Sequence, residues 1–241
     1  MSIDKKQLSK LLSYMTTFGG GVYWPHKRKE TSKVNCKFIM NMRQENLDYV
    51  LWVASVLKEV TGVRIIDRKD YNVDGCTRKE QVRLESRRHP YFTKLRERIY
   101  IDNHKVLDPH MLKMMDAEAL AIIFMTDGSS SLDTRFKNPH CKITLETKGF
   151  SYADNLALSK AIYTATGIRT NVQRRGKYYM LYVKTKDHKL FVDTVSPYML
   201  DSFLYKLERI APALQDGDIV CTDTKVSEID RDDQSLLEKE E

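Results

Sequence analysis

Asp127 and Gly128 are the residues best placed to do chemistry, because they end an apolar stretch that begins at Ala119. A carboxylate is unfavourable at the C-terminal end of a helix, where the helix dipole is negative. A bound divalent cation reverses these local electrostatics, and oxygen ligands suit Mg²⁺. The stretch therefore predicts a metal site, with the alternative that Asp127 and Gly128 only open a turn.

A second stretch in the same register, from Lys10 to Gly20, reads KLLSYMTTFGG. Aligned with the first stretch, it has Phe18 and Gly19 at the positions of Asp127 and Gly128. A phenylalanine side chain binds neither a metal ion nor a proton. The pair predicts two copies of one buried helix, of which only one keeps its carboxylate.

The repeat extends beyond these two helices. In each copy a short β-type stretch passes through Cys-Lys, and an amphipathic helix, further strands and a last helix follow. Each amphipathic helix ends at a glycine, Gly62 or Gly167, which we expect in a left-handed cap. The matching segments are 34–41 with 139–146, 47–60 with 152–165, and the last helices that begin near His89 and His188.

The order helix, hairpin, helix, hairpin, helix predicts an α+β fold of two αββαββα units. A period of this length implies a pseudo-two-fold pair of domains and not a solenoid. Hairpin turns are expected around Asp74 and around Gly176. The expected domains are a first repeat over 1–100, a linker over 101–116, a second repeat over 117–210, and an extension with an acidic tail over 211–241.

The composition is basic, with 40 Lys and Arg against 33 Asp and Glu in 241 residues and a net charge of +7. Such a charge favours a polyanionic partner such as nucleic acid, although a basic protein without one is the alternative. The four cysteines lack the spacing of a zinc site and are expected to be reduced thiols, so we expect an intracellular protein. No apolar run approaches the roughly 20 residues that span a membrane, and no signal or transit peptide is expected.

Three segments together carry a family resemblance: LAIIFMTDGS (120–129), HPYFTKLRERIY (89–100) and SPYMLDSFLYKL (196–207). The chain resembles the LAGLIDADG homing endonucleases of the double-motif, single-chain kind over about residues 7–207. The resemblance implies a monomer whose two motif helices pack at the domain interface. It also implies saddle-shaped antiparallel sheets that lie along double-stranded DNA, and hydrolysis of phosphodiester bonds with Mg²⁺.

The resemblance also implies roles for individual residues. Asp127 is the expected catalytic carboxylate and metal ligand, with the backbones of Gly128 and Gly19 beside the metal. Arg87 and Lys186 are the expected basic residues near the scissile phosphates, although ordinary surface charge is the alternative for both. A single carboxylate favours an enzyme that nicks one strand, but a metal held by other ligands or an inactive protein stays open.

Basic and amide side chains on the strands are expected to contact DNA, interleaved with Tyr178, Tyr179 and Tyr182. A non-cleaving binder of structured RNA, such as a maturase or a ribonucleoprotein factor, is the alternative function; a scaffold is a weaker one. The host compartment stays open between a phage-infected cell, the bacterial cytoplasm and an organelle. The expected DNA-binding residues are Lys37, Arg43, Arg68, Arg83, Lys142, Lys148, Gln173, Arg175, Lys177 and Lys184.

Overall fold

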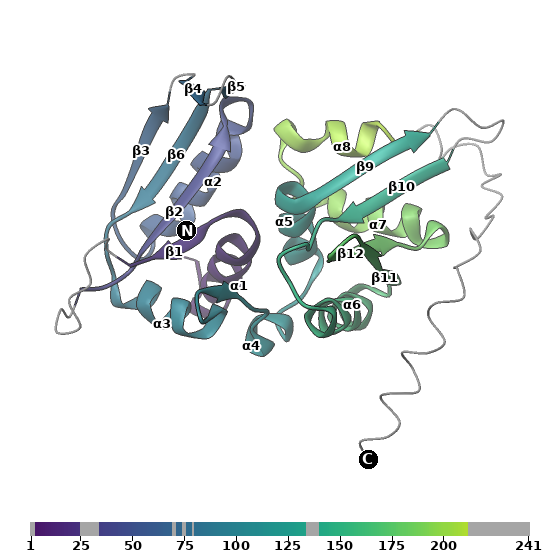
Figure 1. Ribbon diagram of the computed structural model, residues 1–241, viewed down its shortest axis with the longest axis horizontal. Helices are drawn as coiled ribbons and strands as arrows, with labels where there is room; N and C mark the ends of the chain where they lie inside the picture. Colours follow the sequence, from purple (N-terminus) through teal and green to yellow (C-terminus); the bar gives the residue numbers. More distant parts are fainter. Residues whose placement is uncertain are drawn as a thin grey trace, which may run out of the picture.

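The computed structural model describes residues 3–24, 34–68, 71–73, 76–78, 80–133 and 140–211. They form two similar halves that lie side by side, as Figure 1 shows. The first half contains α1 (Lys5–Tyr14), the π-helical turn η1 (Met15–Gly19), β1 (Gly21–Tyr23), β2 (Lys37–Arg43), the 3-10 turn η2 (Gln44–Asn46), α2 (Leu47–Lys58), β3 (Val63–Arg68), β4 (Tyr71–Val73), β5 (Cys76–Arg78), β6 (Gln81–Ser86) and α3 (Pro90–Ile99).

The connection and the second half follow the same plan. The connection holds β7 (Tyr100–Ile101), β8 (His104–Lys105) and α4 (Pro109–Leu112). The second half contains α5 (Ala117–Asp127), β9 (Gly128–Asp133), β10 (His140–Leu145), α6 (Tyr152–Thr166), β11 (Thr170–Arg175), β12 (Tyr178–Val183), the 3-10 turn η3 (Thr185–Asp187), α7 (His188–Val195), the 3-10 turns η4 (Ser196–Tyr198) and η5 (Asp201–Phe203), and α8 (Tyr205–Glu208).

The two main sheets have one topology, which confirms the predicted α+β fold. Their strand orders are β1-β2-β6-β3 and β9-β10-β12-β11, and every pairing in them is antiparallel. In the second half Arg175 pairs with Tyr178 across a two-residue turn in which Gly176 has a φ of 61°. In the first half Val73 pairs with Cys76, and the turn between them lies outside the described residues.

Helix starts follow local capping chemistry. The side chain of Asp4 accepts hydrogen bonds from the backbone at the start of α1, and Asp116 does so for α5. Ser151 and Asp154 form a capping box at the start of α6, which ends on Gly167 at a φ of 75°. The expectation for Gly62 was wrong, because Gly167 and Gly176 are the glycines with positive φ in the described chain.

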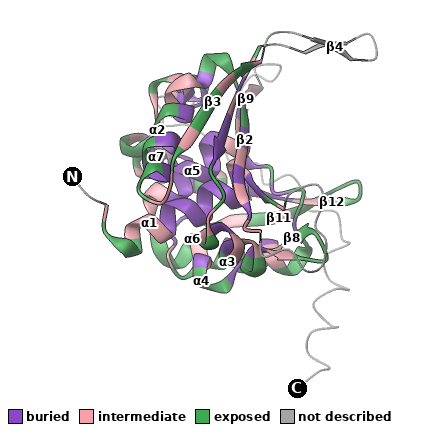
Figure 2. Ribbon diagram, turned by 90° about the vertical axis from the view of Figure 1, so that its left-hand side faces the viewer, coloured by how far each residue is buried: buried purple, intermediate pink, exposed green. Residues whose placement is uncertain are grey.

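The core is centred on the two motif helices, which lie next to each other where the halves meet (Figure 1). Residues 119–125 of α5 are all buried, and Figure 2 shows this helix in the buried interior. Helices α2 and α3 cover one face of the first sheet, and α6 covers the equivalent face of the second. The opposite face of each sheet is therefore left to solvent.

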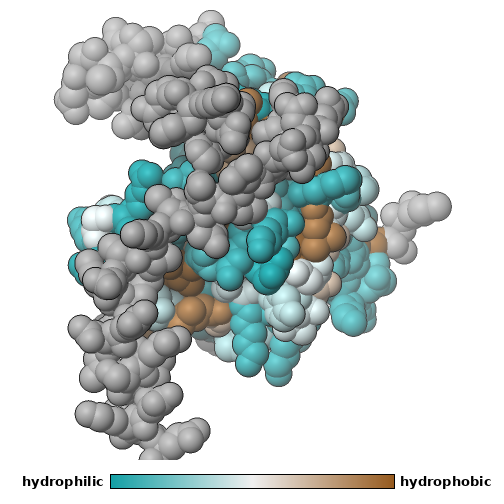
Figure 3. Space-filling model, turned by 90° about the vertical axis from the view of Figure 1, so that its right-hand side faces the viewer, coloured by the Kyte–Doolittle hydropathy of each residue, from teal (hydrophilic) through white to brown (hydrophobic). Residues whose placement is uncertain are grey.

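The predicted linker contains secondary structure, whereas the predicted tail is not described by the structure. Residues 101–116 contain secondary structure, and Lys105 from β8 reaches back into the first half. The predicted tail lies outside the described residues beyond 211. The end of the molecule formed by the second half is mostly hydrophilic, with apolar side chains in separate spots (Figure 3). In the described part of the chain, none of the helices has the length and apolar character needed to span a membrane.

Candidate active site and nucleic-acid interface

Helix α5 ends at Asp127, and strand β9 begins at the next residue. A Cβ on Gly128 would lie 2.2 Å from the Phe124 ring and 2.4 Å from the Phe124 carbonyl oxygen, so only glycine allows this abrupt change of direction. The Glu146 backbone N–H donates to the Asp127 carbonyl oxygen at 2.6 Å. The backbone of Asp127 is thus fixed at the junction of the helix and the sheet.

The environment of Asp127 disfavours its charged form. Burial raises the pKa of this carboxyl to about 6, although the nearby ammonium groups of Lys105 and Lys206 act in the opposite direction. The carboxylate of Glu146 raises the pKa further. A partly buried carboxyl held close to two cations and a second acid is typical of a functional site.

Lys206 closes the C-terminal end of α5. Its Nζ donates to the carbonyl oxygens of Phe124 at 2.9 Å, Met125 at 2.8 Å and Gly128 at 2.7 Å. The Phe124 carbonyl oxygen also accepts the backbone N–H of Gly128. Later carbonyls of a helix have no backbone partner within it, so the buried Lys206 donor stabilises this helix end. Burial lowers the pKa of Lys206 to about 8.

Lys105 does the same for the first motif helix. Its Nζ donates to the carbonyl oxygens of Thr16 at 3.0 Å, Thr17 at 2.8 Å and Gly20 at 2.6 Å. Burial lowers the pKa of Lys105 to about 8 as well. Each half therefore has one lysine, shielded at least partly from solvent, that follows α3 or α7 in the chain and caps the motif helix.

Sequence reasoning missed both lysines. Lys105 lies in the predicted linker, and Lys206 lies in the segment SPYMLDSFLYKL (196–207). No local pattern in this segment indicates a capping role for Lys206. The two lysines share only a weak sequence signal. Each follows α3 or α7 in the chain and stands directly before an apolar residue. Their role depends on contacts across about 80 residues of sequence, which spacing does not reveal.

The two predicted basic catalytic residues lie elsewhere. Arg87 is exposed, and its side chain lies against Gly62 at the turn before β3. Lys186 is exposed in the turn η3 after β12. Neither is among the charges that shift the pKa of Asp127. A catalytic role for these two residues stays a prediction.

The donor set at Asp127 suits a metal ion that keeps water and substrate ligands. Within the described residues, no group of three or more His, Cys, Asp or Glu side chains is placed to hold a metal ion. Mg²⁺ is commonly held by one or two carboxylates together with water and phosphate oxygens. Asp127, with Glu146 nearby, fits that arrangement and does not fit a closed protein cage.

Phe18 and Gly19 lie at the interface between the halves. The Phe18 ring is buried, stacks on the Tyr14 ring at a centroid distance of 6.2 Å, and packs against the tilted Phe150 ring at 5.6 Å. Gly19 lies so close to α5 that a Cβ on it would be 2.8 Å from the Thr126 methyl carbon. The first motif helix therefore ends in an aromatic contact and a glycine, without an acid.

The solvent face of the first sheet is basic. The pairings place Arg43, Gln81 and Arg68 in one row across β2, β6 and β3. Side chains alternate along a strand, so the residues two positions away share this face. This solvent face carries the four predicted DNA-binding residues Lys37, Arg43, Arg68 and Arg83. It also carries the polar residues Asn41, Arg64, Gln81 and Glu85.

The solvent face of the second sheet is also basic. Lys142, Gln173 and Arg175 share it, and Lys142 Nζ lies 4.6 Å from the centre of the Tyr182 ring. Tyr179 was expected there, but its ring packs against the tilted ring of Tyr152 of α6 on the helix-covered face. The remaining predicted residues lie near strand ends: Lys148, which pairs with Glu146 at 2.7 Å, Lys177 at the hairpin turn, and Lys184 after β12.

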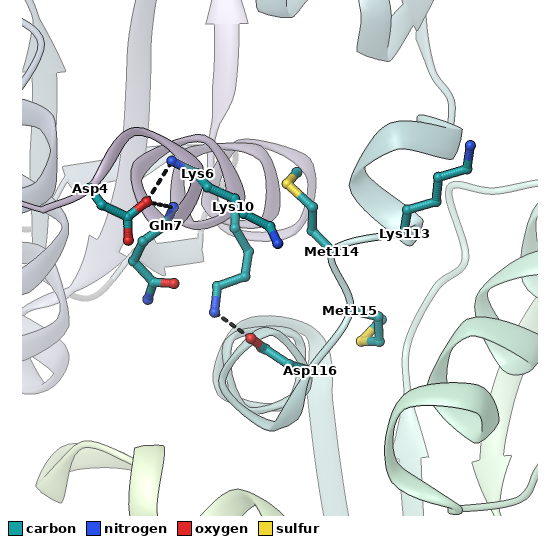
Figure 4. A pocket seen from close by; sticks show the side chains of 8 residues that line it. All are labelled: Asp4, Lys6, Gln7, Lys10, Lys113, Met114, Met115 and Asp116. Carbon is teal, nitrogen blue, oxygen red and sulfur yellow. Dashed lines mark hydrogen bonds and ion pairs between the residues drawn. The ribbon is translucent and has the colours of Figure 1, made fainter.

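A cavity of about 320 Å³ lies at the opposite, N-terminal ends of the motif helices. Lys10 in this cavity is paired with Asp116, as Figure 4 shows. Its Nζ also lies 2.9 Å from a carboxylate oxygen of Glu118. The charge of Lys10 is therefore already balanced. Because the cavity is a helix length away from Asp127, it is separate from the candidate active site.

Comparisons with known proteins agree with this arrangement. The sequence pattern of the LAGLIDADG DNA endonuclease family matches residues 18–191. A probable intron-encoded endonuclease 1 of Wickerhamomyces canadensis is 24% identical over 179 residues, which cover 73% of this chain and 75% of the relative.

Two solved structures share the fold. The homing endonuclease I-WcaI bound to its DNA recognition sequence has a TM-score of 0.67 and 20% identity, over 86% of this chain and 88% of that one. The meganuclease I-SmaMI bound to uncleavable DNA has a TM-score of 0.52 and 9% identity, over 89% and 91%.

Proposed function

Since the chain belongs to the LAGLIDADG DNA endonuclease family, we propose that it is a Mg²⁺-dependent enzyme that binds duplex DNA and cuts one strand beside Asp127. The observation that carries this proposal is the partly buried carboxylate of Asp127, which lies close to the partly buried Lys105 and the buried Lys206 at the interface of the halves. A structural role alone does not require an acid whose ionisation burial opposes.

Binding is assigned to the solvent faces of the two sheets. Their basic side chains neutralise phosphates, while Arg, Lys and Gln side chains recognise base edges in the major groove. The two homing endonuclease structures that share this fold are both bound to DNA. The two halves in one chain form both sheets, so the proposed active form is a monomer.

In the proposed mechanism, Asp127 holds Mg²⁺ and this chain's lysines position Asp127. When bound, the metal supplies a Lewis acid for the scissile phosphate and lowers the pKa of a coordinated water. Lys206 fixes the last turn of α5, so the carboxylate keeps its direction without a flexible loop. The charges of Lys105 and Lys206 favour the phosphate anion and the ionised form of Asp127.

Cleavage of one strand follows from the number of carboxylates. Asp127 serves the second half, whereas the first half has the Phe18 ring and Gly19 at its helix end. Without an acid there, the first half has no protein ligand of the same kind for a second cation. The expected product from a supercoiled plasmid is therefore the open circle and not the linear form.

The test begins with selection of bound duplexes from a random library, because the target sequence is unknown. A plasmid with the selected site is then incubated with Mg²⁺, with Ca²⁺ and with EDTA. We expect nicking with Mg²⁺ that Asp127→Asn abolishes and that the exposed control Asp193→Asn keeps. Nicking that survives Asp127→Asn would overturn the assignment of the site.

A non-cleaving binder of structured RNA is the second candidate, favoured by the missing acid in the first half. It predicts tight binding with no strand cut in Mg²⁺ and no effect of Asp127→Asn. Competition between a structured RNA and a duplex DNA of equal length distinguishes the two functions. Preference for the RNA together with intact plasmid supports this second candidate.

A further inference from the structure

We propose that Gly19, and not Phe18, is the structural counterpart of Asp127, so residue 19 is where the first half lacks its metal-binding carboxylate. The role of that position in strand cleavage rests on the proposed function, whereas its geometry does not. When the two motif helices are aligned by sequence without a gap, Phe18 stands opposite Asp127. Three features of the structure shift the match by one residue.

The first feature is the pair of capping lysines. Lys206 binds the carbonyl oxygens of residues 124, 125 and 128, and Lys105 binds those of residues 16, 17 and 20. The spacing within the two sets is identical. Gly20 therefore matches Gly128, and the residue before Gly20 matches the residue before Gly128.

The second feature is the register of the strands that follow. Strands β2 and β10 align without a gap, so that Ile39 matches Thr144. Gly21 pairs with Ile39, and Ser129 pairs with Thr144. Gly21 therefore matches Ser129, and two positions upstream Gly19 matches the aspartate of α5. This result is independent of the lysine contacts.

The third feature explains why the sequence alignment differs. The first motif helix ends in the π-helical turn η1, whereas α5 stays α-helical to its last residue. In a π-helical turn the hydrogen bond joins residues i and i+5, whereas in an α-helix it joins residues i and i+4. The π-helical turn therefore contains one extra residue. The extra residue moves every later position of the first motif by one.

The surroundings of residue 19 suit a carboxylate, apart from one methyl group. A Cβ at this position would lie 3.3 Å from the hydroxyl oxygen of Tyr49. This hydroxyl is fully buried and has no hydrogen-bond partner among the residues that the structure describes, so it can donate to an acid placed beside it. The obstacle is the methyl carbon of Thr126 at 2.8 Å; the Thr126 Cβ is at 3.8 Å. Phe18 instead contacts Tyr14 and Phe150.

The experiment places an acid at each of the two positions in a Thr126→Ala background, which removes the obstructing methyl group. Gly19→Asp is compared with Phe18→Asp and with the Thr126→Ala parent. Binding of Mn²⁺ to each protein without DNA is counted by electron paramagnetic resonance. The plasmid with the selected site then reports nicked against linear product in Mg²⁺.

We expect Gly19→Asp to bind one more Mn²⁺ than its parent and to produce linear plasmid, while Phe18→Asp does neither. A gain from Phe18→Asp alone, or no gain from either folded variant, overturns the proposal. If even the parent leaves DNA intact, the proposed function fails, but the Mn²⁺ count still tests residue 19.

A cross-link keeps the test decisive if the acidic variants do not fold. The 3.8 Å between a Cβ on residue 19 and the Thr126 Cβ is the separation that a disulfide needs. Gly19→Cys with Thr126→Cys should therefore join these residues on oxidation, as peptide mass spectrometry without reduction would show. Absence of this link in the folded double variant refutes the placement of residue 19.

Discussion

Glu85 on the solvent face of the first sheet offers a sharp test of the electrostatics. Its carboxylate oxygens lie 2.8 Å from Lys37 Nζ, 2.9 Å from Arg64 Nη2 and 2.6 Å from Arg83 Nε. The Glu85 side chain is only 8% exposed. The hydrogen bond from Lys37 is the main reason that the pKa of Glu85 falls to about 2, and Arg64 adds to it. The perturbation is Glu85→Gln, which keeps the shape and removes the charge.

The magnitude follows from the pKa. The decrease from 4.5 to about 2, at about 1.4 kcal/mol per pH unit, sets an upper limit of about 3 kcal/mol. The Arg64 side chain is 69% exposed, and solvent screening reduces such pairs, so we expect a loss of about 1–2 kcal/mol at pH 7. Because the folded pKa is lowered, this stability is present above about pH 4.5 and is lost as the pH falls through about 2.

Urea unfolding of Glu85→Gln and of the parent, between pH 7 and pH 2.5, measures the effect. The matched control is Glu45→Gln, whose exposed side chain pairs with the exposed Arg43, and we expect about 0.5 kcal/mol or less there. A destabilisation by Glu85→Gln that is equally large at pH 7 and pH 2.5 would refute the reasoning. The variant should also bind non-specific DNA more tightly, with a steeper salt dependence, because three cations lose their internal partner.

Three further predictions concern the end of α5. Asp127→Asn should be about 1–3 kcal/mol more stable than the parent above pH 6, with the difference gone below pH 4 in urea unfolding, because burial raises this pKa from 3.8 to about 6. Lys206→Met should cost about 2 kcal/mol in thermal unfolding, since three helix-end carbonyls lose their donor. Gly128→Ala should lower both the unfolding temperature and plasmid nicking, because the new Cβ would meet the Phe124 carbonyl oxygen at 2.4 Å and the backbone must shift.

Much of the fold was readable from local patterns. The repeated order of helices and hairpins predicted two similar α+β halves, and the two sheets share one topology. The alternation of polar residues put Lys37, Arg83 and Lys142 on solvent faces, with Tyr179 as an error. Alternation of polar and apolar residues indicates that the two faces of a sheet differ. A tyrosine is amphipathic and packs on either face, so its type does not show which face it occupies.

The candidate site was readable only in part. Asp127 stands at the end of an apolar run, so its place at the end of a buried helix follows from the sequence alone. The lysines beside it come from segments distant in sequence, and no local spacing relates them to the helix ends that they cap. Their partners are backbone carbonyls, which every residue has. Residue types therefore do not indicate which carbonyls these lysines bind.

Local residue patterns are sufficient to predict two halves, the order of their elements and one acidic helix end. Which residues of the two helix ends correspond depends on tertiary contacts. A one-residue π-helical shift changes the register without changing composition or hydrophobic pattern. Packing of Gly19 against Thr126, the buried lysines and the strand pairings fix that register through contacts between distant segments, which a linear alignment of the chain does not contain.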